Sequence, residues 1–231
     1  MKIVILTGAG ISAESGLGTF RDKDGLWTKY DLNEVATPEG FARNPALVHD
    51  FYNARRANAR AARPNAAHAA IARLTEGMAD RVTLVTQNVD DLHERAGARA
   101  IHMHGSLLGA RCHACAATWD APERMTAADP CPTCGERQTR PDVVWFGEMP
   151  REVDLIHERI LGADLFAAIG TSGQVYPAAG FVDIAREAGA ETVEINLEPT
   201  GFGGQFDRRI IGPASETVPG WVDDLLQQNA R

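Results

Sequence analysis

Long hydrophobic runs are missing from this sequence. None of its 231 residues belong to an apolar run approaching the ~20 residues that cross a bilayer. The first strand-like run, Ile3-Val4-Ile5-Leu6, follows Met1-Lys2 directly; it is too short for a signal-peptide core and no cleavage site follows. We therefore expect no membrane partner and a cytoplasmic location.

Positive charge is also scarce. The formal net charge is −8 and the sequence pI is about 5.4. Nonspecific nucleic-acid binding needs a basic surface that releases counterions, so we expect no nucleic-acid partner. An acidic surface tolerates basic protein segments as substrates, although this is a weak indication because most cytoplasmic proteins are acidic.

Cysteine is absent outside one short segment. The four cysteines are Cys112, Cys115, Cys131 and Cys134, with the spacing C-x2-C-x15-C-x2-C. This spacing is typical of a zinc ribbon, and four thiolates leave no open position for water, so it predicts one structural Zn²⁺ in a reducing compartment. A redox C-x-x-C pair is the alternative. His113, inside the first pair, is expected to be a solvated bystander.

Apolar runs alternate with helical patterns along the rest of the chain. The runs are rich in Val, Ile and Leu, as parallel strands buried on both faces are. The alternation predicts an α/β fold with a doubly wound, mostly parallel, Rossmann-like sheet. Hydrophobic residues make up 44% of the chain, enough for a large core. The expected strands are "KIVILTG", "RVTLVTQN", "AIHMHG", "DVVWFGE", "DLFAAIGTS" and "ETVEINLE". The expected helices are "PNAAHAAIARLTEG", "EVDLIHERILG", "YPAAGFVDIAREAGA" and the C-terminal "SETVPGWVDDLLQQ".

Two segments interrupt this alternation: 20–65, which has no strand signal and an Ala/Arg-rich helix, and 111–140, which is polar and holds the cysteines. We expect one catalytic domain, 1–231, with two lobes. The large lobe would comprise about 1–20, 65–108 and 142–231, and the small lobe a helical part, 21–64, and a zinc module, 109–141. A cleft between the lobes would lie near the carboxyl ends of the strands, where open α/β sheets bind ligands.

The first candidate site is "GAGISA", which begins at Gly8 and matches G-x-G-x-x-[GA]. In a dehydrogenase this motif opens a helix, with an acid ~20 residues on at the end of the next strand. Here Gly16 and Gly18 interrupt any helix, and the chain enters a strandless segment. We expect a loop, with Phe20 and Arg21 inside it, that closes over a ligand. By itself the motif fits a structural tight turn equally well.

Polar residues follow two further predicted strands. Gln87, Asn88 and Asp90 come directly after one, where they could bind ribose hydroxyls and a carboxamide or only cap a helix. His102 and His104 share a face of the next if that strand persists, and His104 stands at its end. His104 is a candidate base, although a lone histidine is more often structural. "GTS" at 170–172 and "NLE" at 196–198 also follow strands, as further contacts or as plain loops.

Together these motifs resemble the sirtuins, NAD-dependent protein-lysine deacylases. The resemblance covers essentially the whole chain, in the order "GAGISAESGLGTFR", "TQNVD", "HG", two C-x-x-C pairs, "VVWFGE", "GTS" and "NLE". Gly18-Thr19 stands where many members have Pro-Asp before Phe-Arg. That departure resembles a bacterial class III subgroup of desuccinylase- and deacetylase-like members.

The resemblance implies a role for each site. His104 would be the general base, and the backbone of "VVWFGE", through Val144, Phe146, Gly147 and Glu148, would pair with an extended acyl-lysine peptide. The zinc would be structural. The residues that would bind NAD are Gly8, Ala9, Gly10, Ile11, Ser12, Phe20, Arg21, Trp27, Gln87, Asn88, Asp90, Gly170, Thr171, Ser172, Asn196, Leu197, Glu198 and Ala214.

The implied chemistry agrees with what the chain lacks. Amide hydrolysis normally needs an activated nucleophile or a metal-bound water, and the sequence has neither a G-x-S-x-G elbow nor an open metal site. In sirtuin chemistry the acyl oxygen attacks the ribose carbon of NAD as nicotinamide leaves. His104, near its reference pKa of ~6.5, would then take a proton from a ribose hydroxyl, and water would complete the release of lysine and O-acyl-ADP-ribose.

The segment "FYNARR" bears on the acyl group. Tyr52 and Arg55 lie three residues apart on a helical pattern, so they share a face and could bind a carboxylate. By pattern alone a solvated basic face fits better, since further arginines follow at 56, 60 and 63. The resemblance reverses this preference: the subgroup that removes succinyl and malonyl groups has a Tyr-x-x-Arg pair here and a small residue upstream, which Ala36 matches. Acetyl-lysine should also fit.

Three alternatives remain. A nicotinamide-dependent dehydrogenase predicts an acid that ends the second strand, which the sequence does not show. A nucleic-acid-binding zinc ribbon predicts a basic face around 112–134, where Asp120, Glu123 and Asp129 stand against Arg124 alone. Mono-ADP-ribosyl transfer to protein would use the same NAD site. The oligomeric state is left open, with a monomer compatible with the sequence.

Overall fold

The fold was obtained as a computed structural model, which describes residues 1–18, 30–200 and 206–229. The predicted NAD contacts Phe20, Arg21 and Trp27 lie outside these residues. Six strands form one parallel sheet in the order β3-β2-β1-β7-β8-β9, which confirms the expected doubly wound α/β fold. These strands are β1 (Ile3–Thr7), β2 (Val82–Thr86), β3 (Ile101–His102), β7 (Leu165–Ile169), β8 (Glu191–Asn196) and β9 (Arg208–Ile211).

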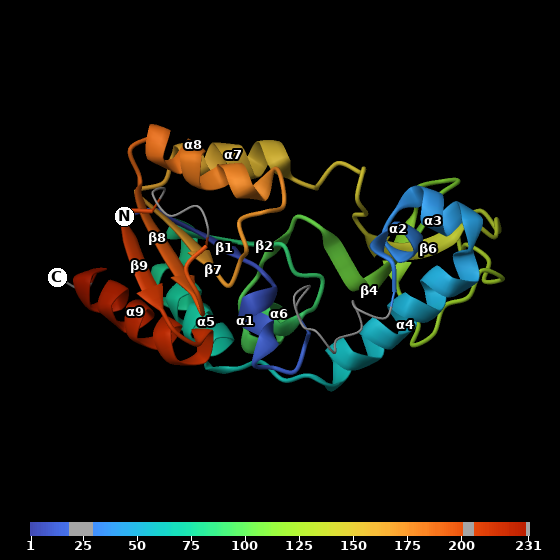
Figure 1. The fold of residues 1–231 in the computed structure, drawn as a ribbon, viewed down its shortest axis with the longest axis horizontal. Helices are drawn as coiled ribbons and strands as arrows, with labels where there is room; N and C mark the ends of the chain where they lie inside the picture. Colours follow the sequence, from blue (N-terminus) through green and yellow to red (C-terminus); the bar gives the residue numbers. More distant parts are fainter. Residues whose placement is uncertain (19–29, 201–205, 230–231) are drawn as a thin grey trace.

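Helices cover both faces of this sheet (Figure 1). On one face lie α5 (Ala66–Met78) and α9 (Ala214–Asn229), and on the other α7 (Val153–Leu161) and α8 (Phe181–Glu187). Strand β1 shows why both faces are buried. Ile3 and Ile5 pack towards α5 and α9, whereas Val4 and Leu6 pack towards α7 and α8, because successive side chains of a strand point to opposite faces.

A second sheet of three antiparallel strands lies away from the first, in the order β5-β4-β6. Its strands are β4 (Gly105–Cys112), β5 (Thr118–Asp120) and β6 (Thr139–Val143). The prediction that "DVVWFGE" forms a strand of the parallel sheet is therefore wrong. Its first residues end β6, and Val143 and Trp145 are buried against helices instead of a second sheet face. The sequence analysis also missed β4, β5 and β9.

The helical segment beside this sheet contains α2 (Leu32–Val35), α3 (Pro38–Arg43) and α4 (Pro45–Ala61). Helix α4 begins sharply because the Asn44 side chain accepts a hydrogen bond from the Leu47 amide and Pro45 occupies the first turn. Its buried face packs on β4 and on the segment after β6. The proposed lobe boundaries stay a prediction.

The remaining elements are short. They are α1 (Ala9–Ala13), α6 (Leu92–Ala96) and two 3-10 turns, Ala79–Arg81 and Ala178–Gly180. Within the described residues, no helix combines the length and apolarity that crossing a membrane requires.

Candidate active site

The glycine motif after β1 packs directly on the turn after β7. The amides of Gly8 and Gly10 donate to the carbonyls of Ile169 and Gly170, at 3.0 and 2.8 Å. A Cβ at Gly10 would lie 2.7 Å from the Gly170 Cα, and Gly170 itself has a φ of +61°. Both glycines are therefore required, since side chains would separate the two turns. Helix α1 is only five residues long, as the following glycines predicted.

A buried polar cluster lies behind these turns. The Asn88 amide donates to the Gly8 carbonyl and to Ser12 Oγ, both at 3.1 Å, and Ser12 Oγ donates to Asp90 Oδ2 at 3.2 Å. Burial raises the pKa of Asp90, whereas its hydrogen bonds from the Leu92 amide and Ser12 oppose the rise. Amide, hydroxyl and carboxylate groups concentrated here fit a ligand that carries ribose hydroxyls and a carboxamide.

His104 follows β3 and adjoins this cluster through Gln87. Its Nδ1 lies 3.0 Å from the Gln87 carbonyl oxygen. A carbonyl only accepts, so Nδ1 carries the proton and Nε2 of the neutral ring is a free base. Burial lowers the pKa of His104 from its usual value, although the hydrogen bond to Gln87 opposes this shift. The strand ends at His102, so the expected common face of His102 and His104 does not form; His102 pairs instead with Glu94 at 3.0 Å.

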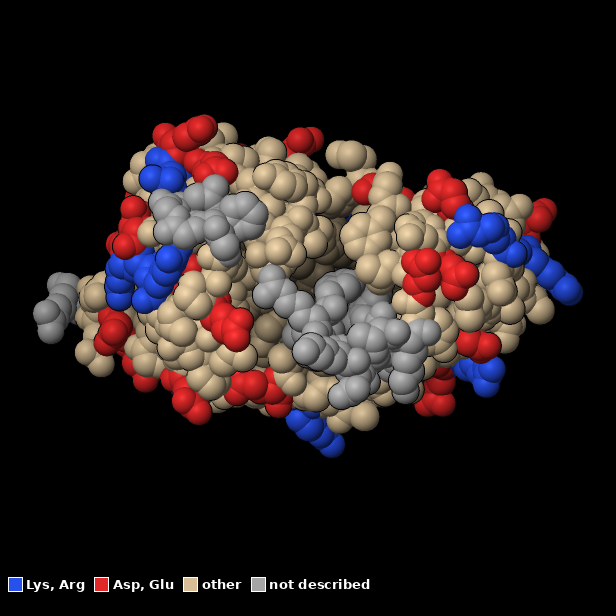
Figure 2. Space-filling view, in the orientation of Figure 1, with Lys and Arg blue, Asp and Glu red and all other residues tan. Residues whose placement is uncertain are grey.

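The other predicted contacts lie at the carboxyl ends of β7 and β8. The Gln87 side-chain amide donates to Thr171 Oγ1 at 2.9 Å, and the Asn196 amide donates to the Thr171 carbonyl at 2.8 Å. Ser172 follows in the same turn, while Leu197 and Glu198 are exposed and Ala214 begins α9. The structure thus brings together at one sheet edge the candidates that follow β1, β2, β3, β7 and β8. Figure 2 shows the surface hollowed near the centre of the view.

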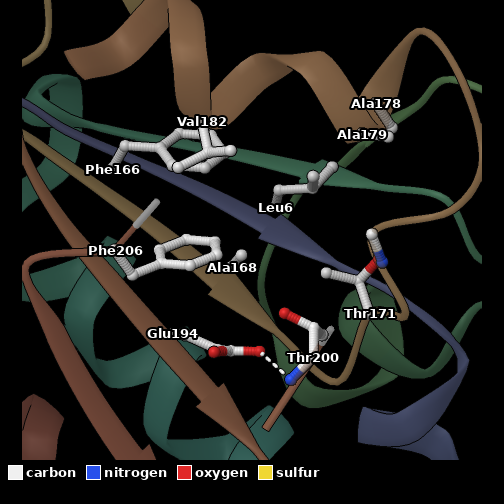
Figure 3. A pocket seen from close by; sticks show the side chains of 11 residues that line it. Leu6, Phe166, Ala168, Thr171, Ala178, Ala179, Val182, Glu194, Thr200 and Phe206 are labelled. Atoms are coloured by element: carbon white, nitrogen blue, oxygen red, sulfur yellow. Dashed lines mark hydrogen bonds between the residues drawn. The ribbon is translucent and has the colours of Figure 1, made fainter. Parts of the chain in front are cut away.

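A small pocket lies on the α8 side of the Thr171 turn (Figure 3). Its walls are apolar, with Leu6, Phe166 and Phe206, and the buried Glu194 carboxylate accepts from the Thr200 amide at its edge. None of its lining residues except Thr171 was a predicted site residue.

The candidate acyl-binding residues meet in one buried cluster. The Phe146 amide donates to the Ala36 carbonyl at 2.9 Å, and Trp145 Nε1 donates to the Tyr52 hydroxyl at 3.0 Å. The Arg55 guanidinium carbon lies 5.6 Å from the Tyr52 ring centre. Ala36 after α2, two residues of α4 and the segment after β6 therefore lie next to one another.

Of the arginines that follow Arg55, Arg56 is buried, whereas Arg60 and Arg63 are exposed. Arg56 is 0% exposed, and its Nε donates to the Leu107 carbonyl at 2.7 Å, so it anchors α4 to β4. Arg60 is exposed, and its guanidinium donates to the Ala121 carbonyl at 3.3 Å. The interpretation of "FYNARR" as part of a solvated basic face is therefore wrong for Arg56, because that side chain is buried between α4 and β4.

The segment after β6 is held by a buried ion pair. Two nitrogens of Arg140 donate to the two Glu148 oxygens, at 2.6 and 2.9 Å, and Glu148 Oε2 also accepts from the Trp145 amide at 2.9 Å. The Val144 amide donates to the His104 carbonyl at 2.8 Å, which joins this segment to the candidate base. Gly147, with a φ of +89°, forms the turn between Trp145 and Glu148.

The four cysteines form one metal-binding group. Their Sγ atoms all lie within 4.8 Å of one another, and the pairs Cys112–Cys134 and Cys115–Cys131 are each 3.7 Å apart. Ligands on a tetrahedral zinc with Zn–S bonds of about 2.3 Å are roughly 3.8 Å apart, whereas a disulfide requires about 2.05 Å. The geometry fits one Zn²⁺ held by all four thiolates, because the two C-x-x-C pairs meet in a single group. His113 does not belong to the group.

The sequence analysis missed several buried polar residues beside the site. His93 Nε2 lies 3.0 Å from Thr7 Oγ1, and His68 lies 3.5 Å from Ser12 Oγ. His68 also reaches back to the Asn65 amide and completes a capping box at the start of α5. The pattern N-x-x-H before an apolar helix was the available signal for His68. Arg140 had no signal, because its partner is set by the turn at Gly147.

Comparison with known proteins gives one consistent result. The Sir2 family model matches residues 8–177. A protein of Caulobacter vibrioides described as an NAD-dependent protein deacylase is 62% identical, over 98% of this chain and 97% of its own length. A Sir2 homologue in complex with NAD superposes with a TM-score of 0.91 at 39% identity, covering 100% of this chain and 91% of that one. A Sir2 variant with a deacetylated p53 peptide and 3'-O-acetyl ADP ribose superposes with a TM-score of 0.79 at 28% identity, covering 98% and 93%. This chain, with its paired glycine turns, the neutral His104 and the four-cysteine group, therefore belongs to the Sir2 family.

Proposed function

We propose that this chain is an NAD-dependent protein-lysine deacylase that removes acetyl, succinyl and malonyl groups and yields nicotinamide, O-acyl-ADP-ribose and free lysine. The observation that carries the proposal is the position of His104, a neutral base beside the buried Asn88–Ser12–Asp90 cluster, at the sheet edge where the two glycine turns meet. The relative and the solved structures described above support the same activity.

Each group of residues has a part in this reaction. NAD supplies, when bound, a ribose carbon that becomes electrophilic as nicotinamide departs. The turns at Gly8–Gly10 and Gly170–Ser172 would hold its phosphates and ribose, since no side chain blocks a close approach of the ligand, while the Gly8 and Gly10 amides join the two turns to each other. Asn88, Ser12 and Asp90 orient the ribose and the carboxamide. Phe20, Arg21 and Trp27 keep their predicted part in NAD binding.

His104 acts at a single atom. Its Nδ1 proton is held by the Gln87 carbonyl, so Nε2 accepts a proton from a ribose hydroxyl. A lowered pKa keeps the ring neutral at pH 7, which a general base requires. The Gln87 side chain, through its bond to Thr171, ties the base to the second turn.

The peptide substrate pairs with the exposed backbone of Val144–Glu148, and its acyl group enters beside Ala36. Tyr52 and Arg55 then bind an acidic acyl group through its carboxylate. Burial raises the pKa of Tyr52, so the phenol stays protonated and can donate. The zinc, held by four thiolates, has no position for a substrate and is structural.

The experiment is an incubation with matched acetyl- and succinyl-lysine peptides, with and without NAD, followed by mass spectrometry. We expect both peptides to lose the acyl group only with NAD, with equimolar nicotinamide and O-acyl-ADP-ribose. Equal loss without NAD would exclude the proposal. An ADP-ribose adduct on a protein target with no deacylation would favour mono-ADP-ribosyl transfer, and NADH absorbance would favour a dehydrogenase. We also keep the cytoplasmic location as a prediction, since free thiolate ligands persist in a reducing compartment.

A further inference from the structure

A buried hydrogen bond joins α4 to the segment after β6. Trp145 Nε1 donates to the Tyr52 hydroxyl oxygen at 3.0 Å, and the two residues are 3% and 1% exposed. An indole N–H in so buried a position needs an acceptor, and the phenol oxygen supplies it. The bond spans 93 positions in the sequence, so it depends on how the two segments pack.

The phenol oxygen of Tyr52 faces two groups that can only donate. An indole N–H and a guanidinium have no acceptor atom. Trp145 donates to the oxygen, and the Arg55 guanidinium carbon lies 5.6 Å from the Tyr52 ring centre. Since neither neighbour can accept, the hydroxyl proton must go to a third group. Among the described residues we find no acceptor for that proton.

The indole itself is held in place. The guanidinium carbon of Arg140 stacks on the Trp145 ring at 3.3 Å from its centre, and the Phe41 ring lies 5.2 Å away. Glu148 forms an ion pair with Arg140 and accepts a hydrogen bond from the Trp145 backbone amide. The same two residues therefore hold both the ring and the backbone of Trp145. A cation stacked on a buried tryptophan stabilises this arrangement. The Nε1–H vector is thus set before any substrate arrives.

We infer that Trp145 is a positioning residue that determines specificity for acidic acyl groups, because it turns the Tyr52 hydroxyl proton towards the acyl site. The inference rests on the proposed deacylase function. With its oxygen accepting from Trp145, Tyr52 presents its proton as a donor beside the cationic Arg55. The Tyr52 hydroxyl and the Arg55 guanidinium together match a carboxylate, which only accepts hydrogen bonds. An acetyl methyl group can form no hydrogen bond with either.

The test replaces Trp145 with Phe, which keeps an aromatic ring for Arg140 and removes the N–H. We expect the ratio of desuccinylation to deacetylation, each as kcat/KM on matched peptides, to fall roughly tenfold, mainly through a higher KM for the succinyl peptide. Phe41→Leu is the control, since it loosens packing on the same ring but keeps the N–H. If both variants lower both activities in the same proportion, Trp145 only packs and the inference is wrong.

A double-mutant cycle gives the decisive readout. Tyr52→Phe should lower the ratio, and Trp145→Phe in that background should lower it no further, because the hydroxyl is already gone. An equal further fall would show that Trp145 does not act through Tyr52. Even if Trp145→Phe does not fold, an unchanged ratio in Tyr52→Phe overturns the inference, because the hydroxyl through which Trp145 acts would then carry no specificity. A wild-type chain that deacylates neither peptide with NAD would refute the proposed function itself, which is a separate result.

Discussion

At the scale of single residues, the site depends on which atoms carry protons. The Gln87 carbonyl assigns the Nδ1 proton to His104, and burial keeps the Tyr52 phenol protonated. One residue therefore accepts a proton and the other donates a hydrogen bond at the same pH. The resemblance to a family suggested these roles, but only the hydrogen-bond partners determine which atoms donate and which accept.

Replacing Arg55 with Met should reduce desuccinylation much more than deacetylation, because only a charged acyl group needs the guanidinium. A charge-assisted hydrogen bond is worth about 1.5–3 kcal/mol, so we expect a roughly ten- to hundredfold loss of kcat/KM for the succinyl peptide. Initial rates with matched peptides measure this effect. Arg63→Met, at an exposed position just beyond α4, is the control. Equal losses on both peptides would make Arg55 structural.

The pH profile of deacetylation should show an acid limb governed by His104. Because burial lowers its pKa, the midpoint of log kcat/KM against pH should lie below ~6.5, and activity should fall as pH drops through it. His104→Tyr should lower kcat/KM at least ~100-fold at every pH, while the protein stays folded and zinc-loaded. A midpoint above neutrality in wild-type enzyme would contradict this assignment.

At the scale of elements, turns decide the site more than helices and strands do. The glycine turns after β1 and β7 pack on each other, and the turn at Gly147 returns Glu148 to Arg140. The first cysteine turn follows β4 and the second lies between β5 and β6, so a metal bound by all four thiolates would join the strands of the small sheet. Such short antiparallel strands are marginal without additional support.

Removing one zinc ligand should unfold the small sheet. Cys131 is buried in the thiolate group, so Cys131→Ser should abolish stoichiometric zinc, measured by atomic absorption, and lower the melting temperature in circular dichroism. Structural zinc contributes about 10–16 kcal/mol, comparable to the whole stability of a domain. His113→Ala, between Cys112 and Cys115 but outside the thiolate group, should keep both zinc and stability. Full zinc content in Cys131→Ser would exclude the four-thiolate site.

At the scale of the whole molecule, the core has separate parts that meet at the candidate site. Two apolar clusters cover the faces of the parallel sheet, and a third joins α2 and α4 to β4 and Trp145. Buried polar groups fill the region between them: Thr7, Ser12, His68, Asn88 and His93. The same buried polar residues therefore contribute both to the stability of the fold and to the geometry of the candidate site.

The buried histidines should make stability fall in mild acid. Burial lowers the pKa of His68 to about 4 and of His93 to about 3, from 6.5. The unfolded chain binds these protons below pH 6.5 and the folded chain does not, so the free energy of unfolding should decrease as pH falls from about 6.5 to 4, by about 3 kcal/mol per histidine. Asp90, whose pKa burial raises, acts in the opposite sense at the acid end.

Urea unfolding at pH 7 and pH 4.5 measures this slope. His93→Gln should flatten it, because the variant no longer has a neutral histidine to protonate on unfolding. His113→Gln, at an exposed position, should leave the slope as in wild type. Equal slopes in wild type and His93→Gln would show that other groups control acid stability.

Local pattern was enough to predict much of this protein. Near-continuous apolar runs identified β1, β2, β7 and β8, the cysteine spacing identified the metal group, and residues placed directly after strands proved to lie at one edge of the sheet. These features depend on periodicity and on short spacings, which the chain expresses without long-range contacts. The resemblance to a family added expected roles for individual residues, several of which stay predictions.

Tertiary structure alone decided the rest. It put "DVVWFGE" at the end of an antiparallel strand, buried Arg56 under α4, paired Arg140 with Glu148, and set Trp145 against Tyr52. Burial and donor–acceptor partners are properties of chain segments that meet in space, and a pKa or a tautomer follows from them. The sequence by itself determined which chemical groups were available and on which elements they lie. Packing determined which of those groups face one another, because a hydrogen bond or ion pair forms only where the fold brings both partners within reach.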